Sequence, residues 1–250
     1  SPFDRATVVV IDAIGEFDTI TIYGAEYVNG QAKYKKLWGQ KYPHSIGLFY
    51  SAMTQEVGLK PMEEEYILMG MAAYGSWQAS GIMKDQLVDD IKKVTLKENL
   101  HIGSSYSFKD HFDIEDIAAS AQRVAEELIY SVMLRARDFN WSDNLVYQGG
   151  VALNCLANRS LGEYFKNIWI MPNPGDSGLS LGAIAWHTRE QLDFKHAFLG
   201  YDIKGKYPTN KLLDSLLKGE IVGVANGRAE FGPRALGNRS LLADPRGPDI

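Results

Sequence analysis

The segment from residue 144 to residue 191 constrains the fold most, because it alternates strand-like and helix-like patterns. NLVYQ has the composition of a short buried strand, and GGVALNCLANRSLGEYF indicates a two-glycine turn that leads into a helix. NIWIMPNPGD indicates a second strand with a rigid turn, and SGLSLGAIAWHTREQL a second helix. Strand–helix–strand–helix sequences of this length form mostly parallel, helix-covered sheets. The sequence therefore predicts an α/β fold.

The remaining elements are predicted from hydrophobic spacing. Residues 7–38 contain three strand-like runs, with a hairpin turn at Asn29-Gly30 between the second and the third. Residues 44–75 have helical spacing, and a further helix is expected near 84–92. The clearest helix covers residues 114–139, where apolar residues recur every three or four positions after Asp113, the expected cap.

The end of the chain is expected to begin a second domain. Residues 196–211 show little periodicity and are interpreted as a linker. A short helix, a glycine turn and a strand follow it. The expected ranges are a first domain over 1–195, the linker over 196–211, and the start of a second domain over 212–250.

Charge and cysteine content exclude several classes of protein. The formal net charge of −5 gives no general attraction to nucleic acid or anionic membranes, so neither is expected as a partner. The single cysteine, Cys155, rules out an internal disulfide and favours a reducing compartment such as the cytoplasm. No stretch approaches the ~18 apolar residues of a membrane helix. The five histidines show no metal-binding spacing.

Two glycines mark a candidate nucleotide site. Gly149 and Gly150 stand between a strand and a helix, where backbone N–H groups and the helix dipole favour a phosphate. A tight turn explains the same glycines equally well. Asn154 lies one turn further on, where it could reach the same ligand or simply be a surface amide.

A second candidate turn is more specific. Pro172 and Pro174 stiffen the approach, Gly175 permits the turn, and Asp176 and Ser177 lie at the entry of a helix made of small residues. A capping role for Asp176 or Ser177 contributes about 1 kcal/mol but does not require these prolines and glycines. Asp176 is therefore a candidate metal ligand or phosphate–metal bridge.

Two further stretches contain candidate ligand-binding residues. In the expected hairpin after the first strand, Asp12, Gly15 and Glu16 match the way in which actin-like ATPases hold phosphate and metal, although acidic turns are common. Near the end of the chain, AEFGPRALGNRSLLADPR places arginines around Gly232, Pro233 and Gly237. Arginine binds phosphate and carboxylate through paired hydrogen bonds, but a cluster of arginines can also be simply solvated.

Taken together, these stretches resemble the O-carbamoyltransferase family that includes nodulation and antibiotic-tailoring carbamoyltransferases. The resemblance spans nearly the whole chain in the family's order, and its most specific parts are VYQGGVALNCLANR, PNPGDSGLSLGA and GRAEFGPRALGNRSLLADPR. It implies an actin-like (ASKHA) ATPase domain followed by the start of a YrdC-like α/β domain. It also implies that carbamoyl phosphate and ATP give carbamoyl-adenylate, whose carbamoyl group passes to a small-molecule hydroxyl.

The resemblance also implies roles for individual residues. Asp176 matches the family's metal aspartate, for a divalent ion such as iron or magnesium whose histidine ligands are expected outside this chain. The nucleotide-binding candidates are Asp12, Gly15, Glu16, Gly149, Gly150, Asn154, Gly175 and Ser177. The candidates for binding carbamoyl phosphate or the adenylate are Arg234 first, then Arg228, Asn238 and Arg239. No catalytic base is identified.

The sequence departs from the family pattern at two places and is expected to be a fragment. Ala13 replaces the usual glycine after the hairpin aspartate, and Ile67 stands where the family commonly has lysine. The chain is expected to begin within the ATPase-like domain and to be inactive alone, with oligomers possible. Two other hypotheses remain. One is a tRNA-modifying (threonylcarbamoyl) ATPase or sugar-kinase-like enzyme on the same fold, and the other is a non-catalytic nucleotide-binding module.

Overall fold

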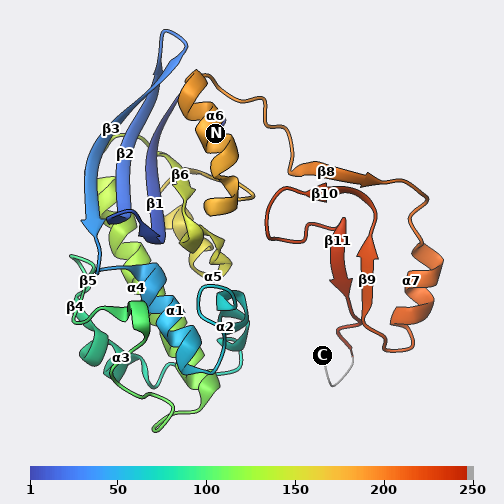
Figure 1. The fold of residues 1–250 in the computed structure, drawn as a ribbon, viewed down its shortest axis with the longest axis horizontal. Coiled ribbons are helices and arrows are strands. Elements are labelled where there is room, and N and C mark those ends of the chain that lie inside the picture. The colour runs from blue at the N-terminus through green and yellow to red at the C-terminus, as the bar shows by residue number, and fades with distance from the viewer. Residues whose placement is uncertain (247–250) are drawn as a thin grey trace. The chain divides into compact units, whose positions relative to one another are not determined.

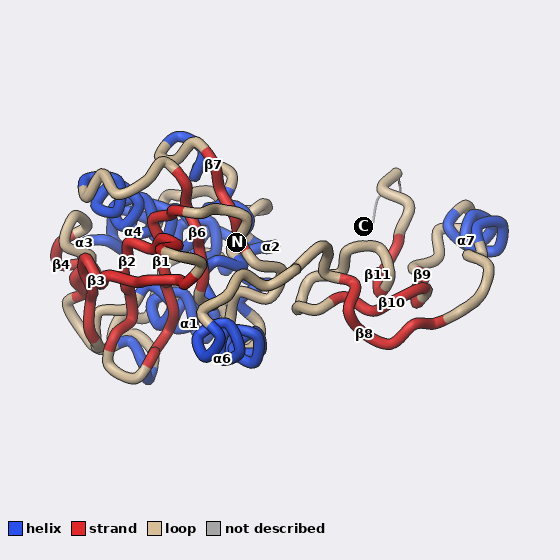
Figure 2. Tube along the Cα trace, turned by 90° about the horizontal axis from the view of Figure 1, so that it is seen from above, coloured by secondary structure: helices blue, strands red, loops and turns tan. Residues whose placement is uncertain are grey.

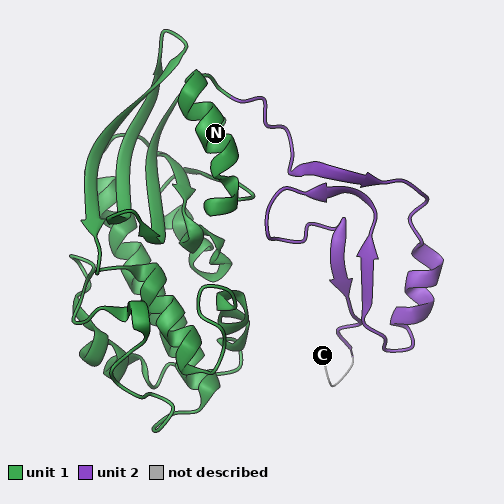
Figure 3. Ribbon diagram, viewed as in Figure 1, with its two compact units in different colours: residues 1–191 green, residues 192–250 purple. Residues whose placement is uncertain are grey.

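The protein forms two compact units, residues 1–191 and residues 192–250, in the computed structural model, which describes residues 1–246 (Figure 3). The segment expected to be a linker, residues 196–211, differs from that expectation because it contains strand β8 (Phe198–Ile203), which is paired within the second unit. The domain ranges inferred from the sequence stay a prediction, and the last of them ends in residues 247–250, outside the described residues.

The first unit is built on a five-stranded mixed sheet in the order β3-β2-β1-β6-β7 (Figure 1). Its strands are β1 (Arg5–Gly15), β2 (Asp18–Val28), β3 (Gln31–Lys41), β6 (Asn144–Gln148) and β7 (Asn167–Ile170). The first three are antiparallel neighbours, whereas β6 runs parallel to β1 and β7 parallel to β6. The three strands predicted over 7–38 and the α/β class are confirmed, and the five strands lie side by side (Figure 2).

The core lies between this sheet and two helices. Val9 pairs with Ile22 and Ile11 with Ile20, so four fully buried side chains share one face of the sheet. Helix α1 (Ile46–Glu56) packs on β1 and on the long helix α4 (Ile114–Asp138). The predicted helix over 114–139 is therefore confirmed. Asp113 occupies the cap position with extended backbone but makes no side-chain cap hydrogen bond.

Other helix predictions need correction. The helix expected after the two glycines is broken into η2 (Gly150–Leu153), α5 (Cys155–Asn158) and η3 (Leu161–Glu163). The break occurs because Asn154 leaves the helical region and caps α5 with its side chain. The helix expected near 84–92 lies earlier, as α3 (Ser80–Leu87), and strand β4 (Val88–Asp90) follows it and pairs with β5 (Thr95–Leu96).

The first unit also contains α2 (Glu65–Met71), η1 (Leu100–Ile102), η4 (Asp176–Gly178) and α6 (Leu179–Thr188). In the second unit, β8 pairs with β10 (Gly227–Glu230), and β9 (Val222–Ala225) pairs with β11 (Arg239–Leu242), both antiparallel. Helix α7 (Thr209–Leu216) precedes β9. Within residues 1–246, no helix has the length and apolar character needed to cross a membrane.

Candidate functional site

Three segments of the first unit converge where β6 and β7 end and where β1 leaves its regular pairing. Because β6 pairs in parallel with β1 up to Val10 and Gln148, the next residues, Ile11 and Gly149, are also neighbours. The backbone N–H of Gly149 donates to the carbonyl of Pro174 at 2.9 Å, which links the turn after β6 to the turn after β7. The carboxyl ends of parallel strands are the usual binding edge of α/β sheets.

Gly149 is required by close packing, and Gly150 lies close against the Asp12 side chain. A Cβ on Gly149, whose φ is +92°, would lie 2.1 Å from the carbonyl oxygen of Ile11. A Cβ on Gly150 would lie 3.1 Å from Oδ1 of Asp12, and one on Gly175 would lie 3.7 Å from the Cα of Gly150. The three glycines therefore bring the backbones of the turns against each other and against Asp12.

Asp12 lies at the centre of this convergence. Its Oδ1 accepts a hydrogen bond from the backbone N–H of Ala13 at 2.8 Å. Burial raises the pKa of the Asp12 carboxyl above its ordinary value, the N–H groups of Ala13 and Gly150 act against that rise, and the negative charge of Asp176 adds to it. Two carboxylates close enough to repel each other form a favourable position for a cation.

Helix α1 supports the Asp12 segment from the other side. Ser45 caps this helix by accepting from the N–H of Leu48 at 3.1 Å, and its hydroxyl donates to the carbonyl of Ala13 at 2.7 Å. A Cβ on Gly47 would lie 2.6 Å from the Cα of Ala13. The N-terminus of α1 is thus packed directly on the residue that follows Asp12.

The structure gives Asp176 and Ser177 different roles. Neither side chain makes a cap hydrogen bond at the start of η4 or α6, so the capping alternative is not supported. The Ser177 hydroxyl instead donates to Oδ1 of buried Asn173 at 2.7 Å. Asp176 is exposed and lies within electrostatic range of Asp12.

Three other predicted residues lie in different local environments. Asn154 is buried, and its amide is bonded to Gln122 and to the N–H of Ala157, so it holds the turn in place. Gly15 pairs with Asp18, and Glu16 follows at an exposed turn with a φ of +53°. The pairing slips between Ile11 and Gly15, where β1 advances four residues while β2 advances two, so this segment bulges out of the regular strand.

In the second unit, the loop of residues 231–238 connects β10 to β11. Arg239 forms an ion pair with Glu230 at 2.8 Å, and the side chain of Asn238 donates to the carbonyl of Arg228 at 2.8 Å. Arg234 is half-buried in the loop, whereas the Arg228 side chain is exposed on β10. Two of the four candidates for anion binding are thus engaged in bonds that shape the loop.

Comparison with known proteins identifies the family. The family described as "Carbamoyltransferase N-terminus" matches residues 1–185, and "Carbamoyltransferase C-terminus" matches residues 213–250. The chain belongs to the carbamoyltransferase family. This confirms the resemblance found in the sequence.

Several carbamoyltransferase relatives match most of the chain. An uncharacterised protein of Synechocystis is 34% identical, with 98% of this chain and 48% of the relative covered. The nodulation protein NolO of Bradyrhizobium diazoefficiens is 28% identical, with 98% and 51% covered. The 3'-hydroxymethylcephem-O-carbamoyltransferase of Streptomyces clavuligerus is 25% identical, with 82% and 44% covered. The chain spans about half the length of these curated relatives.

Sequence reasoning missed several residues that shape the candidate site and the loop of residues 231–238. Ser45 and Asn173 are ordinary polar residues in sequence, with no signal of their role. Gln122 did carry a signal, because it occupies a position on the apolar face of α4 and is buried there. Glu230 is also buried. Among residues 1–246, no group of three or more histidine, cysteine, aspartate or glutamate side chains could hold a metal.

Proposed function

We propose that this chain supplies nucleotide- and donor-binding segments of an ATP-dependent O-carbamoyltransferase. In the proposed reaction, water displaces phosphate from carbamoyl phosphate, and the resulting carbamate attacks the α-phosphate of ATP, so that pyrophosphate leaves and carbamoyl-adenylate forms. Its carbamoyl group then moves to the hydroxyl of a small molecule. The observation that carries the proposal is the convergence of Asp12, the Gly149–Gly150 turn and the Pro174–Asp176 turn at one sheet edge. An actin-like fold for the first unit and a YrdC-like fold for the second belong to the same proposal.

The glycine turns suit a nucleotide for a steric reason. With no side chain on Gly150 or Gly175, a phosphate can approach the backbone without displacing a Cβ. Gly149 is needed to build the turn itself, since its backbone has a positive φ and presses against Ile11. Gly150 and Gly175 are therefore the glycines that we assign to nucleotide contact, with Asn154 and Ser177 holding the turns.

A divalent cation fits the chemistry of the same edge. Asp12 and Asp176 provide oxygen ligands of the kind that magnesium and iron accept, and their mutual repulsion would be relieved by a cation. We therefore propose Asp12 as a second carboxylate ligand beside Asp176. A bound cation would polarise a carbamoyl or phosphate oxygen.

The proposed transfer step is an acyl transfer. The acceptor oxygen forms a bond to the carbamoyl carbon, the bond between that carbon and the AMP phosphate oxygen breaks, and AMP leaves with the electron pair. The hydroxyl proton passes to a base that this chain does not identify. The task of the segments described here is to bind and orient the nucleotide, so that the attacking and leaving oxygens are correctly placed.

The binding part of this proposal can be tested by calorimetry. ATP with magnesium or manganese is titrated into the chain and into the variants Asp12→Asn, Asp176→Asn and Asp85→Asn. Asp85 is an exposed acid on α3 and serves as the matched control. We expect Asp12→Asn and Asp176→Asn each to weaken metal-dependent binding by at least about tenfold, since each removes one charged ligand. Equal binding by all variants would overturn the assignment of this edge.

The reaction is tested in the protein extended to the length of its relatives. Exchange between ATP and labelled pyrophosphate is measured with and without carbamoyl phosphate. Exchange that depends on carbamoyl phosphate supports adenylate formation. Exchange or ATP hydrolysis that does not depend on carbamoyl phosphate would instead support a kinase or tRNA-modifying ATPase. ATP binding with neither exchange nor hydrolysis would support a non-catalytic nucleotide-binding module.

A further inference from the structure

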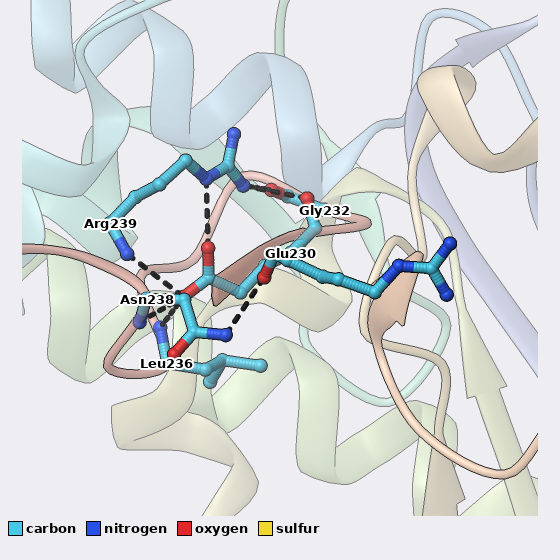
Figure 4. Close-up of polar contacts among 6 residues, drawn as sticks. Glu230, Gly232, Leu236, Asn238 and Arg239 are labelled. Carbon is cyan, nitrogen blue, oxygen red and sulfur yellow. Dashed lines mark hydrogen bonds and ion pairs between the residues drawn. The ribbon is translucent and has the colours of Figure 1, made fainter. Parts of the chain in front are cut away.

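The 231–238 loop is shaped by the carboxylate that precedes it. Oε1 of Glu230 accepts hydrogen bonds from the backbone N–H groups of Leu236 at 2.8 Å and Asn238 at 2.9 Å (Figure 4). A third N–H, that of Arg239, lies 3.3 Å from the same oxygen. One side-chain oxygen thus fixes the returning half of the loop.

Arg239 closes the loop from its far end. Its Nε donates to Oε2 of Glu230 at 2.8 Å, and its Nη2 donates to the carbonyl of Glu230 at 2.6 Å. The same Nη2 lies 3.4 Å from the carbonyl of Gly232 (Figure 4). The planar guanidinium therefore ties the first residues of the loop to the residue that follows it.

Because Glu230 is buried, its carboxylate depends on these hydrogen bonds. The Glu230 side chain is only 1% exposed, while that of Arg239 is 48% exposed. Burial by itself acts to raise the pKa of Glu230, but the hydrogen bonds from Arg239, Leu236 and Asn238 outweigh it and hold the pKa at about 2. A buried carboxylate that lost these partners would be left uncompensated.

Two roles for Arg239 exclude each other: contact with a bound anion, and the ion pair with Glu230. An anion that took the guanidinium of Arg239 for itself would compete with Glu230 for the same donors. Arg234 lies in the middle of the loop, between the residues that Glu230 and Arg239 hold. A loop fixed at both ends presents such a residue in one orientation and lowers the entropy lost when a ligand binds.

We propose that Glu230 and Arg239 form a clasp that positions the 231–238 loop, so that Arg234 meets the phosphate group of carbamoyl phosphate. Glu230 is then a positioning residue, and Arg239 acts through it instead of contacting the donor. This inference rests on the proposed function for the identity of the donor. The clasp itself rests on the hydrogen bonds and the burial of Glu230.

A double-mutant cycle tests the clasp. Carbamoyl phosphate is titrated calorimetrically into the chain and into Glu230→Gln, Arg239→Gln, the double variant and Arg234→Gln, with inorganic phosphate as a second probe. We expect Glu230→Gln and Arg239→Gln each to weaken carbamoyl phosphate binding about tenfold. The double variant should bind no more weakly than the weaker of the two single variants, because both substitutions disrupt the same interaction. Arg234→Gln should weaken binding further in every background. Glu220→Gln and Lys218→Gln, exposed in the same unit, are the controls.

The outcomes separate the two proposals. If Arg239→Gln weakens binding by the same factor in the Glu230→Gln background, Arg239 contacts the anion directly and the clasp is overturned, while the donor site stands. If the unmodified chain fails to bind carbamoyl phosphate, or binds it no better than Arg234→Gln, the donor site of the proposed function is overturned.

A second measurement needs no ligand. Amide hydrogen exchange of Leu236 and Asn238 should be slow in the unmodified chain and fast in Glu230→Gln and Arg239→Gln, while the amides of the β9–β11 pair stay protected. Protection retained at Leu236 and Asn238 in both variants would refute the clasp whatever the anion affinity. Loss of protection throughout the second unit would also refute it, since Glu230 would then be holding the whole unit.

Discussion

Gln122 and Asn154 exchange two hydrogen bonds across 32 residues of sequence. Nε2 of Gln122 donates to Oδ1 of Asn154 at 3.0 Å, and Nδ2 of Asn154 donates back to Oε1 of Gln122 at 2.9 Å. Tyr50 and Glu126 complete this buried network, each bonded to Gln122. The pair couples the middle of α4 to the residue that ends the two-glycine turn.

We predict that Gln122→Ala and Asn154→Ala each lower the free energy of unfolding by about 1–3 kcal/mol, since each leaves a buried amide without its partner. The double variant should lose less than the sum of the two, because the second change removes the orphaned group. Urea denaturation of the four proteins measures these values. Strict additivity would show that the two amides do not interact.

Gly149→Ala is predicted to be poorly tolerated. Its Cβ would meet the Ile11 carbonyl oxygen at 2.1 Å in a backbone conformation that alanine resists, so a loss of about 3 kcal/mol or more is expected. Gly162→Ala, where the added Cβ meets nothing within 4 Å, is the matched control. Thermal melting compares the two, and equal melting temperatures would contradict the packing of this turn.

Gly150→Ala should separate binding from stability. The added Cβ would lie 3.1 Å from Oδ1 of Asp12, without any positive φ to oppose it. We expect a stability loss below about 1 kcal/mol but a marked loss of ATP affinity, because the methyl group occupies the surface assigned to phosphate. Calorimetry and melting on the same sample test this, and unchanged affinity would argue against phosphate contact there.

Asp12→Asn is predicted to stabilise the metal-free protein at pH 7. The raised pKa means that the ionised carboxylate is costly in the fold, so the wild type is relatively more stable below the ordinary Asp pKa of 3.8 and less stable above it. Removing the charge should therefore raise the melting temperature of the metal-free protein at pH 7. Calorimetric melting at pH 7 and pH 3 checks the sign, and a gain that is as large at pH 3 would contradict it.

Glu230 should make the second unit acid-sensitive. Its pKa falls from an ordinary 4.5 to about 2 on folding, so its contribution is complete above pH 4.5 and disappears as the pH drops toward 2. The stability difference between the unmodified chain and Glu230→Gln should shrink over that window. Amide NMR of the second unit follows its unfolding, and a difference that stays constant from pH 5 to pH 2 would rule out this linkage.

The local sequence pattern was sufficient to predict the elements whose structure depends on neighbouring residues. The hairpins over residues 7–38 follow from β-branched runs and the Asn29-Gly30 turn, and α4 follows from apolar spacing over its length. The broken helix after Gly150 could not be foreseen, because its break depends on a bond between Asn154 and the distant Gln122. Strand β8 was missed for the same reason, because its formation depends on pairing with the distant strand β10.

The sequence by itself determined the α/β class, the family and the turns that bear the candidate residues, because glycine, proline and apolar periodicity act over a few neighbouring positions. Only the tertiary structure decided which candidates meet. Parallel pairing of β1 with β6 and of β6 with β7 brings Asp12, Gly150 and Asp176 to one edge, while Asn154 and Arg239 bond to the buried side chains of Gln122 and Glu230. Contacts between distant segments depend on sheet register and burial, which no local pattern encodes.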